Sequence, residues 1–310
     1  MTTPPRAEAA VPASDLAGWI GARRPVLEAA LDRALPPETA WPATIHRAVR
    51  YSLFAGGKRI RPLLVLAAAE AVGGEACDAL PLACAVEMIH TYSLIHDDLP
   101  AMDDDDLRRG KPTSHKVFGE AIAILAGDAL LTRAFHLMAE VGPDAAPEAA
   151  RRRLGAIAVL GEAAGTAGLI GGQVEDLESE GRAVDAPLLE RLHRAKTGAL
   201  LSACVRGGAV LAGAGAEDLA RLEAYGSAIG LAFQVVDDVL DGTADDAALG
   251  KTAGKDEAAG KATYVRVHGL EGARKIASGL LADAEVAVRP FGERGRILAG
   301  LAEMIVRRRA

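Results

Sequence analysis

Apolar residues recur with the spacing of an α-helix along most of the chain, and no run of alternating β-branched residues competes with them. The apolar stretches are separated by joints of about three residues, such as 142–144 and 213–215, which are too short to link domains. The expected helical stretches are residues 63–72, 82–95, 122–138, 154–177, 188–210, 219–240 and 297–306. The pattern predicts one all-α bundle around a central cavity, formed by residues 15–310 behind a flexible tail of residues 1–14.

A run of aspartates follows the apolar stretch 82–95: Asp97, Asp98 and residues 103–106. Like charges this close repel one another and raise each other's pKa, unless a polyvalent cation lies among them. Asp97 and Asp103 are six residues apart, which does not suit one face of a straight helix, but Pro100 favours a kink or bulge between them. Asp104 would suit an unbroken helix better, so the spacing leaves both residues open as partners of Asp97. A solvated helix end is the structural alternative.

A second acidic cluster, Asp237, Asp238 and Asp241, closes the apolar stretch 219–240. Asp237 and Asp241 are four residues apart and share one helix face. Gly242 is a plausible helix stop, which places these carboxylates in a last turn, where the helix dipole disfavours negative charge. A hard cation would reverse that penalty. Two such clusters inside apolar stretches predict bound metal, and oxygen ligands of this kind suit Mg²⁺ completed by substrate phosphates.

Basic residues lie near both clusters, as an anionic ligand would require. They occur in the string 56–62 (Gly-Gly-Lys-Arg-Ile-Arg-Pro), at 108–111, in the string 196–198, and at Lys251, Lys255 and Lys261. Each string alone also fits a loop with a basic tip, and Arg108 and Arg109 could simply neutralise the aspartates before them. Together with the metal clusters, the basic residues indicate a diphosphate ligand.

Residues 92–113, with the aspartates of the first cluster, and residues 230–241 resemble the two aspartate-rich motifs of the trans-polyprenyl diphosphate synthase family. The resemblance extends through the strings at 56–62, 171–173, 196–198 and 260–264, and so covers residues 15 to 308 or thereabouts. The bacterial farnesyl diphosphate synthases (geranyltranstransferases) of this family are the most similar in pattern. The resemblance implies the isoprenoid synthase type I fold. It also implies a head-to-tail condensation of isopentenyl diphosphate with dimethylallyl or geranyl diphosphate.

The resemblance also implies how the site residues divide their work. The Mg²⁺ ligands would be Asp97, Asp103 and Asp237, with Asp98, Asp238 and Asp241 as outer or alternate ligands, and Mn²⁺ as a substitute ion. The allylic diphosphate would bind Arg108, Lys196, Lys251 and Lys261, while Thr197 and Gln234 would stabilise the allylic cation. Isopentenyl diphosphate would bind Gly57, Lys58, Arg61, His90 and Arg109. The catalytic set would be Asp97, Asp98, Asp103, Lys196, Thr197, Gln234 and Asp237.

Tyr92 lies about one and a half helical turns before Asp97, where its ring could close the floor of a product cavity, with Ser93 beside it. By the resemblance, a large side chain here favours a fifteen-carbon product, although geranyl or geranylgeranyl diphosphate remains open. His96 is expected to be structural. Gln173 and Asp176 could line the cavity or serve helix packing.

The net charge of −7 argues against a nucleic-acid partner, and the acidic excess lies largely in the two clusters. No run of eighteen apolar residues and no signal-peptide layout appears, so we expect no transmembrane segment. Three cysteines without a Cys-x-x-Cys motif suit a reducing cytoplasm. The resemblance also implies that the protein is a homodimer. A class I terpene cyclase and a non-catalytic subunit of a prenyl synthase remain as alternative classes.

Overall fold

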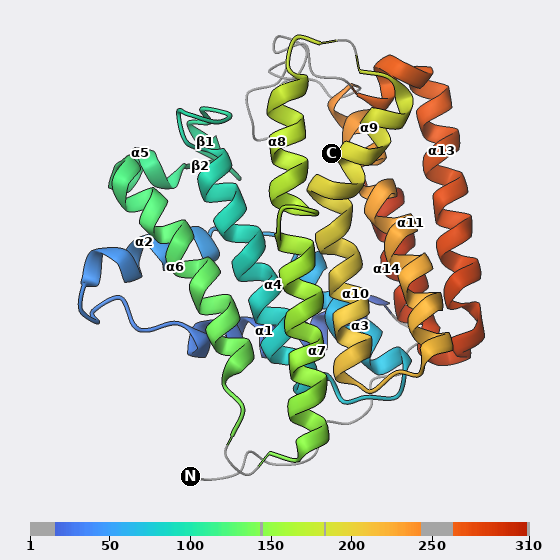
Figure 1. Ribbon diagram of the computed structural model, residues 1–310, viewed down its shortest axis with the longest axis horizontal. Helices are drawn as coiled ribbons and strands as arrows, with labels where there is room; N and C mark the ends of the chain where they lie inside the picture. The colour runs from blue at the N-terminus through green and yellow to red at the C-terminus, as the bar shows by residue number, and fades with distance from the viewer. Residues whose placement is uncertain (1–15, 143–144, 183, 243–262, 309–310) are drawn as a thin grey trace.

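The computed structural model describes residues 16–142, 145–182, 184–242 and 263–308, which form an all-α bundle (Figure 1). Its α-helices are α1 (Leu16–Ala34), α2 (Ala43–Leu53), α3 (Ile60–Ala71), α4 (Ala76–Asp97), α5 (Ser114–Phe118), α6 (Glu120–Ala139), α7 (Pro147–Ala164), α8 (Leu169–Ser179), α9 (Ala186–His193), α10 (Ala199–Leu211), α11 (Ala216–Asp241), α13 (Tyr264–Val288) and α14 (Arg296–Val306). A π-helix, η1 (Arg194–Gly198), joins α9 to α10, and a 3₁₀ segment, η2 (Arg289–Gly295), joins α13 to α14. In the described part of the chain the only sheet is an antiparallel hairpin of β1 (Leu107–Arg108) and β2 (Lys111–Pro112).

The core is built around α3, α4 and α10. In α3, ten of twelve residues are buried, which is typical of a helix that is apolar on all sides and enclosed by others. Gly208 of α10 lets the two backbones approach closely, because a Cβ there would lie 2.3 Å from the carbonyl oxygen of Val65 in α3. The surrounding helices therefore pack against a dense inner layer.

The expected helices are present, but one expected stretch is divided and another changes its helical geometry part of the way along. The stretch 154–177 breaks between α7 and α8, where a Cβ on Gly168 would lie 2.1 Å from the carbonyl oxygen of Ala163. The stretch 188–210 contains η1, whose five-residue hydrogen-bonding pattern differs from the helices on either side. The expectation of a continuous helix was wrong for 154–177, whereas 188–210 is helical throughout and changes only its hydrogen-bonding geometry within η1. Apolar periodicity does not register such a local change of helical geometry. The flexible tail expected over residues 1–14 lies outside the described residues.

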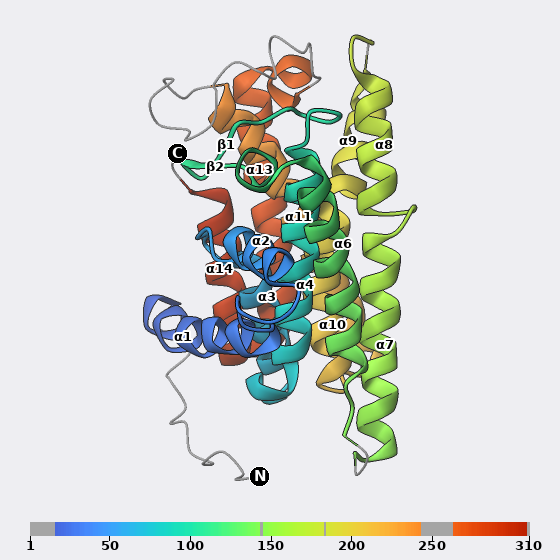
Figure 2. The same cartoon turned by 90° about the vertical axis from the view of Figure 1, so that its left-hand side faces the viewer.

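Helices α6, α7 and α8 form one outer side of the bundle, where α7 and α8 run end to end (Figure 2). Large apolar side chains on this side are exposed, namely Ile124 and Leu125 of α6, Leu154 of α7, and Ile170, Val174 and Leu177 of α8. Two stretches here, Glu120–Ala139 and Pro147–Ser179, have the length and mean hydropathy of a membrane span, with 33% of each such window buried. The core helices of bundles share this length and composition, so the expectation of no transmembrane segment stays a prediction.

Candidate functional site

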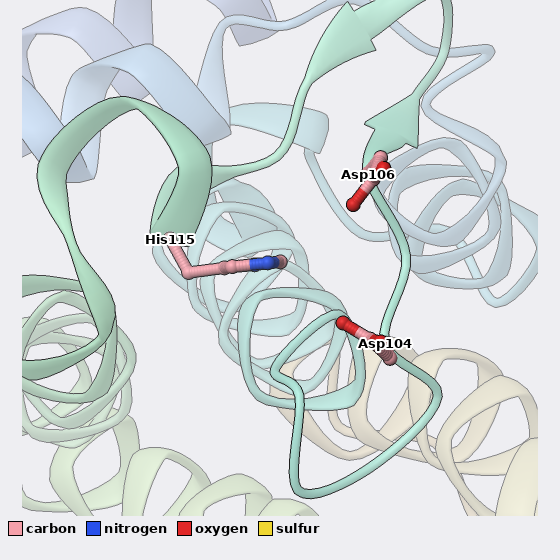
Figure 3. Close-up of side chains that lie close together, drawn as sticks. All are labelled: Asp104, Asp106 and His115. Atoms are coloured by element: carbon pink, nitrogen blue, oxygen red, sulfur yellow. The ribbon is translucent and has the colours of Figure 1, made fainter.

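The first aspartate segment begins where α4 ends. Asp97 is the last residue of α4, and the chain then turns back, so that the backbone N–H of Asp103 donates to the carbonyl oxygen of Asp97 at 2.9 Å. The N–H of Asp105 likewise donates to the carbonyl oxygen of Asp98 at 3.2 Å. The expected kink or bulge is thus a helix end followed by a reversing loop. The loop brings Asp103 beside Asp97, whereas Asp104 lies with Asp106 and His115 (Figure 3).

Arg108 holds this loop in place. Its Nε donates to Oδ1 of the buried Asp98 at 2.9 Å, and its Nη2 lies 3.2 Å from Oδ2 of Asp105. A planar guanidinium that binds two carboxylates fixes the loop more firmly than a single ion pair would. Asp98 therefore orients Arg108 in this structure.

Asp97 is a partly buried carboxyl group with a raised pKa. Burial raises the pKa of Asp97 to about 6; Lys196 opposes the shift, and Asp103 adds to it by like-charge repulsion. A divalent ion between Asp97 and Asp103 would offset the repulsion between the two carboxylates. The donor set, carboxylate oxygens at a helix end, is the kind that Mg²⁺ accepts.

The second cluster lies in the last turn of α11, which ends at Gly242 as expected. Asp237 forms an ion pair with Arg308, at 2.7 Å between Oδ1 and Nη2. Asp238 is buried, and burial raises its pKa to about 7, while the N–H of Tyr264 (2.7 Å) and Nε2 of Gln234 (3.1 Å) donate to it. Asp238 thus joins α11 to the start of α13.

The π-helix η1 presents Lys196 and Thr197. The Nζ atom of Lys196 lies 2.6 Å from Oδ2 of Asp176 in α8, and Oγ1 of Thr197 donates to Oε1 of Gln234 at 3.0 Å. A Cβ on Gly172 would lie 2.2 Å from the backbone nitrogen of Lys196, so only glycine lets α8 pack against η1. A π-bulge of this kind is frequent at functional sites.

The residues expected to bind isopentenyl diphosphate converge from three segments. Gly57 has φ +130°, and a Cβ there would lie 2.6 Å from Nη1 of Arg109, which donates to the carbonyl oxygen of Gly56. Burial, and then the charges of Arg61, Arg109, Arg108 and Arg59, lower the pKa of His90 well below its usual value. His90 is therefore neutral at pH 7 and surrounded by guanidinium groups. Lys58, on the same loop, is exposed.

Arg59 lies within the same basic string but has a structural role. It is buried, with φ +53°, and it donates to Glu28 at 2.9 Å and to the buried Glu87 at 2.7 Å. This buried ion pair anchors the loop 56–59, on which Lys58 is exposed.

Tyr92 is 94% buried, and its ring meets that of His96 edge to face at 5.8 Å. His96 is structural, as expected: its Nε2 lies 3.0 Å from the carbonyl oxygen of Ile124, and a Cβ on Gly127 would collide with its ring. The hydroxyl of Ser93 donates to the carbonyl oxygen of His90 at 2.9 Å, so this side chain is hydrogen-bonded within α4.

Both aspartate segments, on α4 and α11, lie at the same end of the bundle, at the top of Figure 1. Two further residues contact the site residues: Arg308, which pairs with Asp237, and Asp176, which pairs with Lys196. The sequence analysis assigned neither to the site. Arg308 had no signal beyond its place in a basic run, and Asp176 was noted only as a possible cavity residue. Lys251, Lys255 and Lys261 lie outside the described residues.

The chain matches the family model for polyprenyl synthetase over residues 42–286. It belongs to the polyprenyl synthetase family and is a prenyltransferase of the short-chain type.

Among curated proteins, it is 50% identical to a dimethylallyltranstransferase of Fischerella ambigua over 95% of this chain and 84% of that protein. It is 52% identical to geranylgeranyl pyrophosphate synthase 11 of Arabidopsis thaliana (90% of this chain, 78% of that protein). It is 45% identical to farnesyl diphosphate synthase of Geobacillus stearothermophilus (94% and 97%). Relatives that are named for products of different length thus have similar sequence identity to this chain.

Solved structures agree in fold. An FPP/GFPP synthase of Zymomonas mobilis superposes with a TM-score of 0.83 at 38% identity, over 95% of this chain and 99% of that one. A geranyltransferase of Helicobacter pylori, complexed with magnesium and isoprenyl diphosphate, superposes with a TM-score of 0.82 at 32% identity, over 93% and 96%. The expected all-α fold of the isoprenoid synthases is confirmed.

Proposed function

We propose that this protein condenses isopentenyl diphosphate head-to-tail with dimethylallyl or geranyl diphosphate, in a Mg²⁺-dependent reaction. The observation that carries the proposal is the placement of Asp97 and Asp103 at the end of α4 and of Asp237 at the end of α11, at one end of the bundle. The magnesium in the complex of the Helicobacter pylori relative supports the choice of ion.

Asp97, Asp103 and Asp237 would hold Mg²⁺, with Asp98, Asp238 and Asp241 in outer or alternate positions. When bound, the ions neutralise the charge that develops on the diphosphate leaving group as the allylic C–O bond breaks. Lys196, held by Asp176 at 2.6 Å, and Arg108 would bind oxygens of the same diphosphate. Lys251 and Lys261 complete this set in the proposal, although they lie outside the described residues.

Isopentenyl diphosphate would occupy the guanidinium-rich region around His90, bound by Lys58, Arg61 and Arg109, with backbone access at Gly57. The neutral state of His90 suits this role, because a neutral imidazole donates a hydrogen bond without adding charge to the surrounding arginines. Mutual repulsion among those arginines falls when a dianionic or trianionic group binds between them.

Thr197 and Gln234 would stabilise the allylic cation. Their side chains are already hydrogen-bonded to each other at 3.0 Å, and Asp238 fixes the amide of Gln234. They supply oxygen dipoles that are weakly nucleophilic, so the cation is stabilised without being captured. The double bond of isopentenyl diphosphate then attacks the cation, and the released pyrophosphate is the proposed acceptor of the proton.

We place the product at fifteen carbons, because the bulky Tyr92 lies on α4 before Asp97, where it would stop the growing chain. The alternative is geranylgeranyl diphosphate, in keeping with the Arabidopsis thaliana relative, or geranyl diphosphate. Mn²⁺ is proposed as a substitute ion.

A homodimer is proposed through the outer side formed by α6, α7 and α8, where the large apolar side chains of Ile124, Leu125 and Leu154 are exposed. We also retain the expectation of a cytoplasmic enzyme, with which the free thiols of Cys77, Cys84 and Cys204 agree.

The test is to incubate purified protein with Mg²⁺, labelled isopentenyl diphosphate, and dimethylallyl or geranyl diphosphate, and to resolve the products by chromatography. Incorporation of label into a longer allylic diphosphate is the expected result. A terpene cyclase would instead consume the allylic diphosphate without incorporating label, and a non-catalytic subunit would do neither.

A further inference from the structure

Three side chains of metal-ligand type lie together beside the catalytic aspartates. Asp104, Asp106 and His115 each offer a ligand atom, and these atoms lie within 4.8 Å of one another (Figure 3). Asp104 and Asp106 belong to the loop after Asp103, and His115 belongs to α5, which follows the β1–β2 hairpin. None of the three is among the residues proposed for Mg²⁺ or for either substrate.

His115 provides the reason to consider an ion. Its side chain is 93% buried, and its Nε2 has no hydrogen-bond partner, although the ring is directed toward the two aspartates (Figure 3). A buried ring nitrogen without a partner has lost its hydrogen bonds to water and gained none in return, so a bound ligand would supply the missing interaction.

The hydrogen bonds around Thr113 fix the state of this ring. Oγ1 of Thr113 donates its single proton to the carbonyl oxygen of Asp105 at 2.8 Å, and it lies 3.1 Å from Nδ1 of His115. Nδ1 must therefore carry the proton of the neutral imidazole and donate it to Thr113. Nε2 is then left with a free lone pair, which is the arrangement of a metal-ligating histidine held by its other nitrogen.

One imidazole and two carboxylates favour Zn²⁺ or Mn²⁺ over Mg²⁺, which prefers oxygen ligands alone. Ligand atoms at about 2.1 Å from a tetrahedral ion lie about 3.4 Å apart, so the three ligand atoms, which lie within 4.8 Å of one another, would have to close by up to about 1.4 Å. Asp104 and Asp106 are exposed and can make that movement. Lys116, whose Nζ lies 2.7 Å from Oδ1 of Asp106, competes with the ion for one carboxylate.

We propose that Asp104, Asp106 and His115 form a second metal site, which takes a first-row transition ion such as Zn²⁺ or Mn²⁺ and fastens the aspartate loop to α5. The ion is separate from those bound with substrate. It acts as a positioning ion, because residues 104–107 connect Asp103 to Arg108. A movement of this segment would displace both residues.

The experiment uses the full chain, stripped with chelator and then titrated with Zn²⁺ by calorimetry, with Mg²⁺ in large excess and no diphosphate. Co²⁺ replaces Zn²⁺ in a parallel titration, followed by its visible absorption. The expected result is one Zn²⁺ site, which H115Q weakens by at least about tenfold and which D104N and D106N also weaken. K116M should strengthen it, because the competing ammonium group is gone.

Two controls separate this site from others. H136Q alters an exposed histidine at the end of α6, whose Nε2 lies 3.7 Å from Oε1 of Glu140, the residue that caps this helix. This pair offers adventitious metal ligands, and the variant should leave the titration unchanged. D97N/D237N removes the proposed catalytic ligands and should also leave the site intact. Zn²⁺ binding that survives H115Q, or that disappears in D97N/D237N, would overturn the proposal. A protein that elongates prenyl chains and binds no Zn²⁺ would overturn it too, while leaving the proposed function standing.

Discussion

The guanidinium of Arg308 lies 2.7 Å from the carboxylate of Asp237 and 3.9 Å from the ring of Phe233, four residues earlier on α11. Arg308 also donates to the carbonyl oxygen of Phe233 at 2.7 Å. The end of the described chain thus neutralises the aspartate that the proposed function assigns to a metal ion. Cation binding at Asp237 and pairing with Arg308 are alternatives for one carboxylate.

Arg308→Ala should therefore raise the affinity of the substrate-free protein for Mg²⁺. A partly exposed ion pair contributes about 1 kcal/mol, so we expect a gain of about fivefold, measured by calorimetry with Mg²⁺. Arg307→Ala is the matched control, because Arg307 pairs with Glu303 on an exposed helix face. Equal affinity in the two variants would show that Arg308 does not compete for Asp237.

Asp97→Asn should stabilise the metal-free protein at alkaline pH. The pKa of Asp97 is raised to about 6 in the folded state from an ordinary value near 4, so the folded protein holds a proton that the unfolded chain releases. The free energy of unfolding that Asp97 contributes therefore falls as the pH rises from about 4 to about 6, and it is constant above that range. In EDTA the variant should thus melt higher than the wild type at pH 8 and equally near pH 4. A difference that is constant with pH would refute the assigned shift.

Gly172→Ala should disrupt η1. The added Cβ would meet the backbone nitrogen of Lys196 at 2.2 Å, which no side-chain rotation relieves, so we expect a loss of about 2 kcal/mol or more in the free energy of unfolding. Condensation activity should fall with it, because Lys196 and Thr197 move. Gly161→Ala is the matched control on α7: its Cβ would meet nothing closer than 3.8 Å, and it should stabilise the helix by up to about 1 kcal/mol. If chemical denaturation finds the two variants equally stable, the close packing of α8 on η1 is not required.

Tyr92→Ala should lengthen the product by at least one five-carbon unit, since it removes a buried ring from α4 before Asp97. Product chromatography after incubation with geranyl diphosphate measures the effect. Tyr92→Phe is the control: the hydroxyl of Tyr92 has no hydrogen-bond partner in the described part of the chain, so its loss should leave the product unchanged. An unaltered product from Tyr92→Ala would place the floor of the cavity elsewhere.

The sequence was informative where a local rule fixes the outcome. α11 ends at Asp241 with Gly242 as its C-cap, where a glycine after the apolar pattern predicts a helix end, and His96 is structural because it lies on a packed face. The family resemblance supplied what spacing left open, above all the choice of Asp103 over Asp104. The structure gives a physical reason for that choice, since the loop returns the backbone of Asp103 to Asp97 and turns Asp104 toward His115.

Other features depend on contacts between distant segments, which periodicity does not encode. The π-helix η1 occurs where α8 packs against Lys196, and the pairing of Arg308 with Asp237 joins residues 71 positions apart. The division of α7 from α8 likewise follows from a close backbone approach at Gly168. A single sequence marks these places only as glycines or as an isolated charge.

The most direct test of the central claim is a crystal structure of the protein with Mn²⁺ and a non-ionising thiolo analogue of geranyl diphosphate, with the ions located by anomalous scattering. The account predicts Mn²⁺ bound to Asp97 and Asp103 and Mn²⁺ bound to Asp237, with the same diphosphate completing both sets of ligands. A diphosphate bound without contact to ions at either aspartate segment, or aspartates that face solvent in the complex, would contradict it.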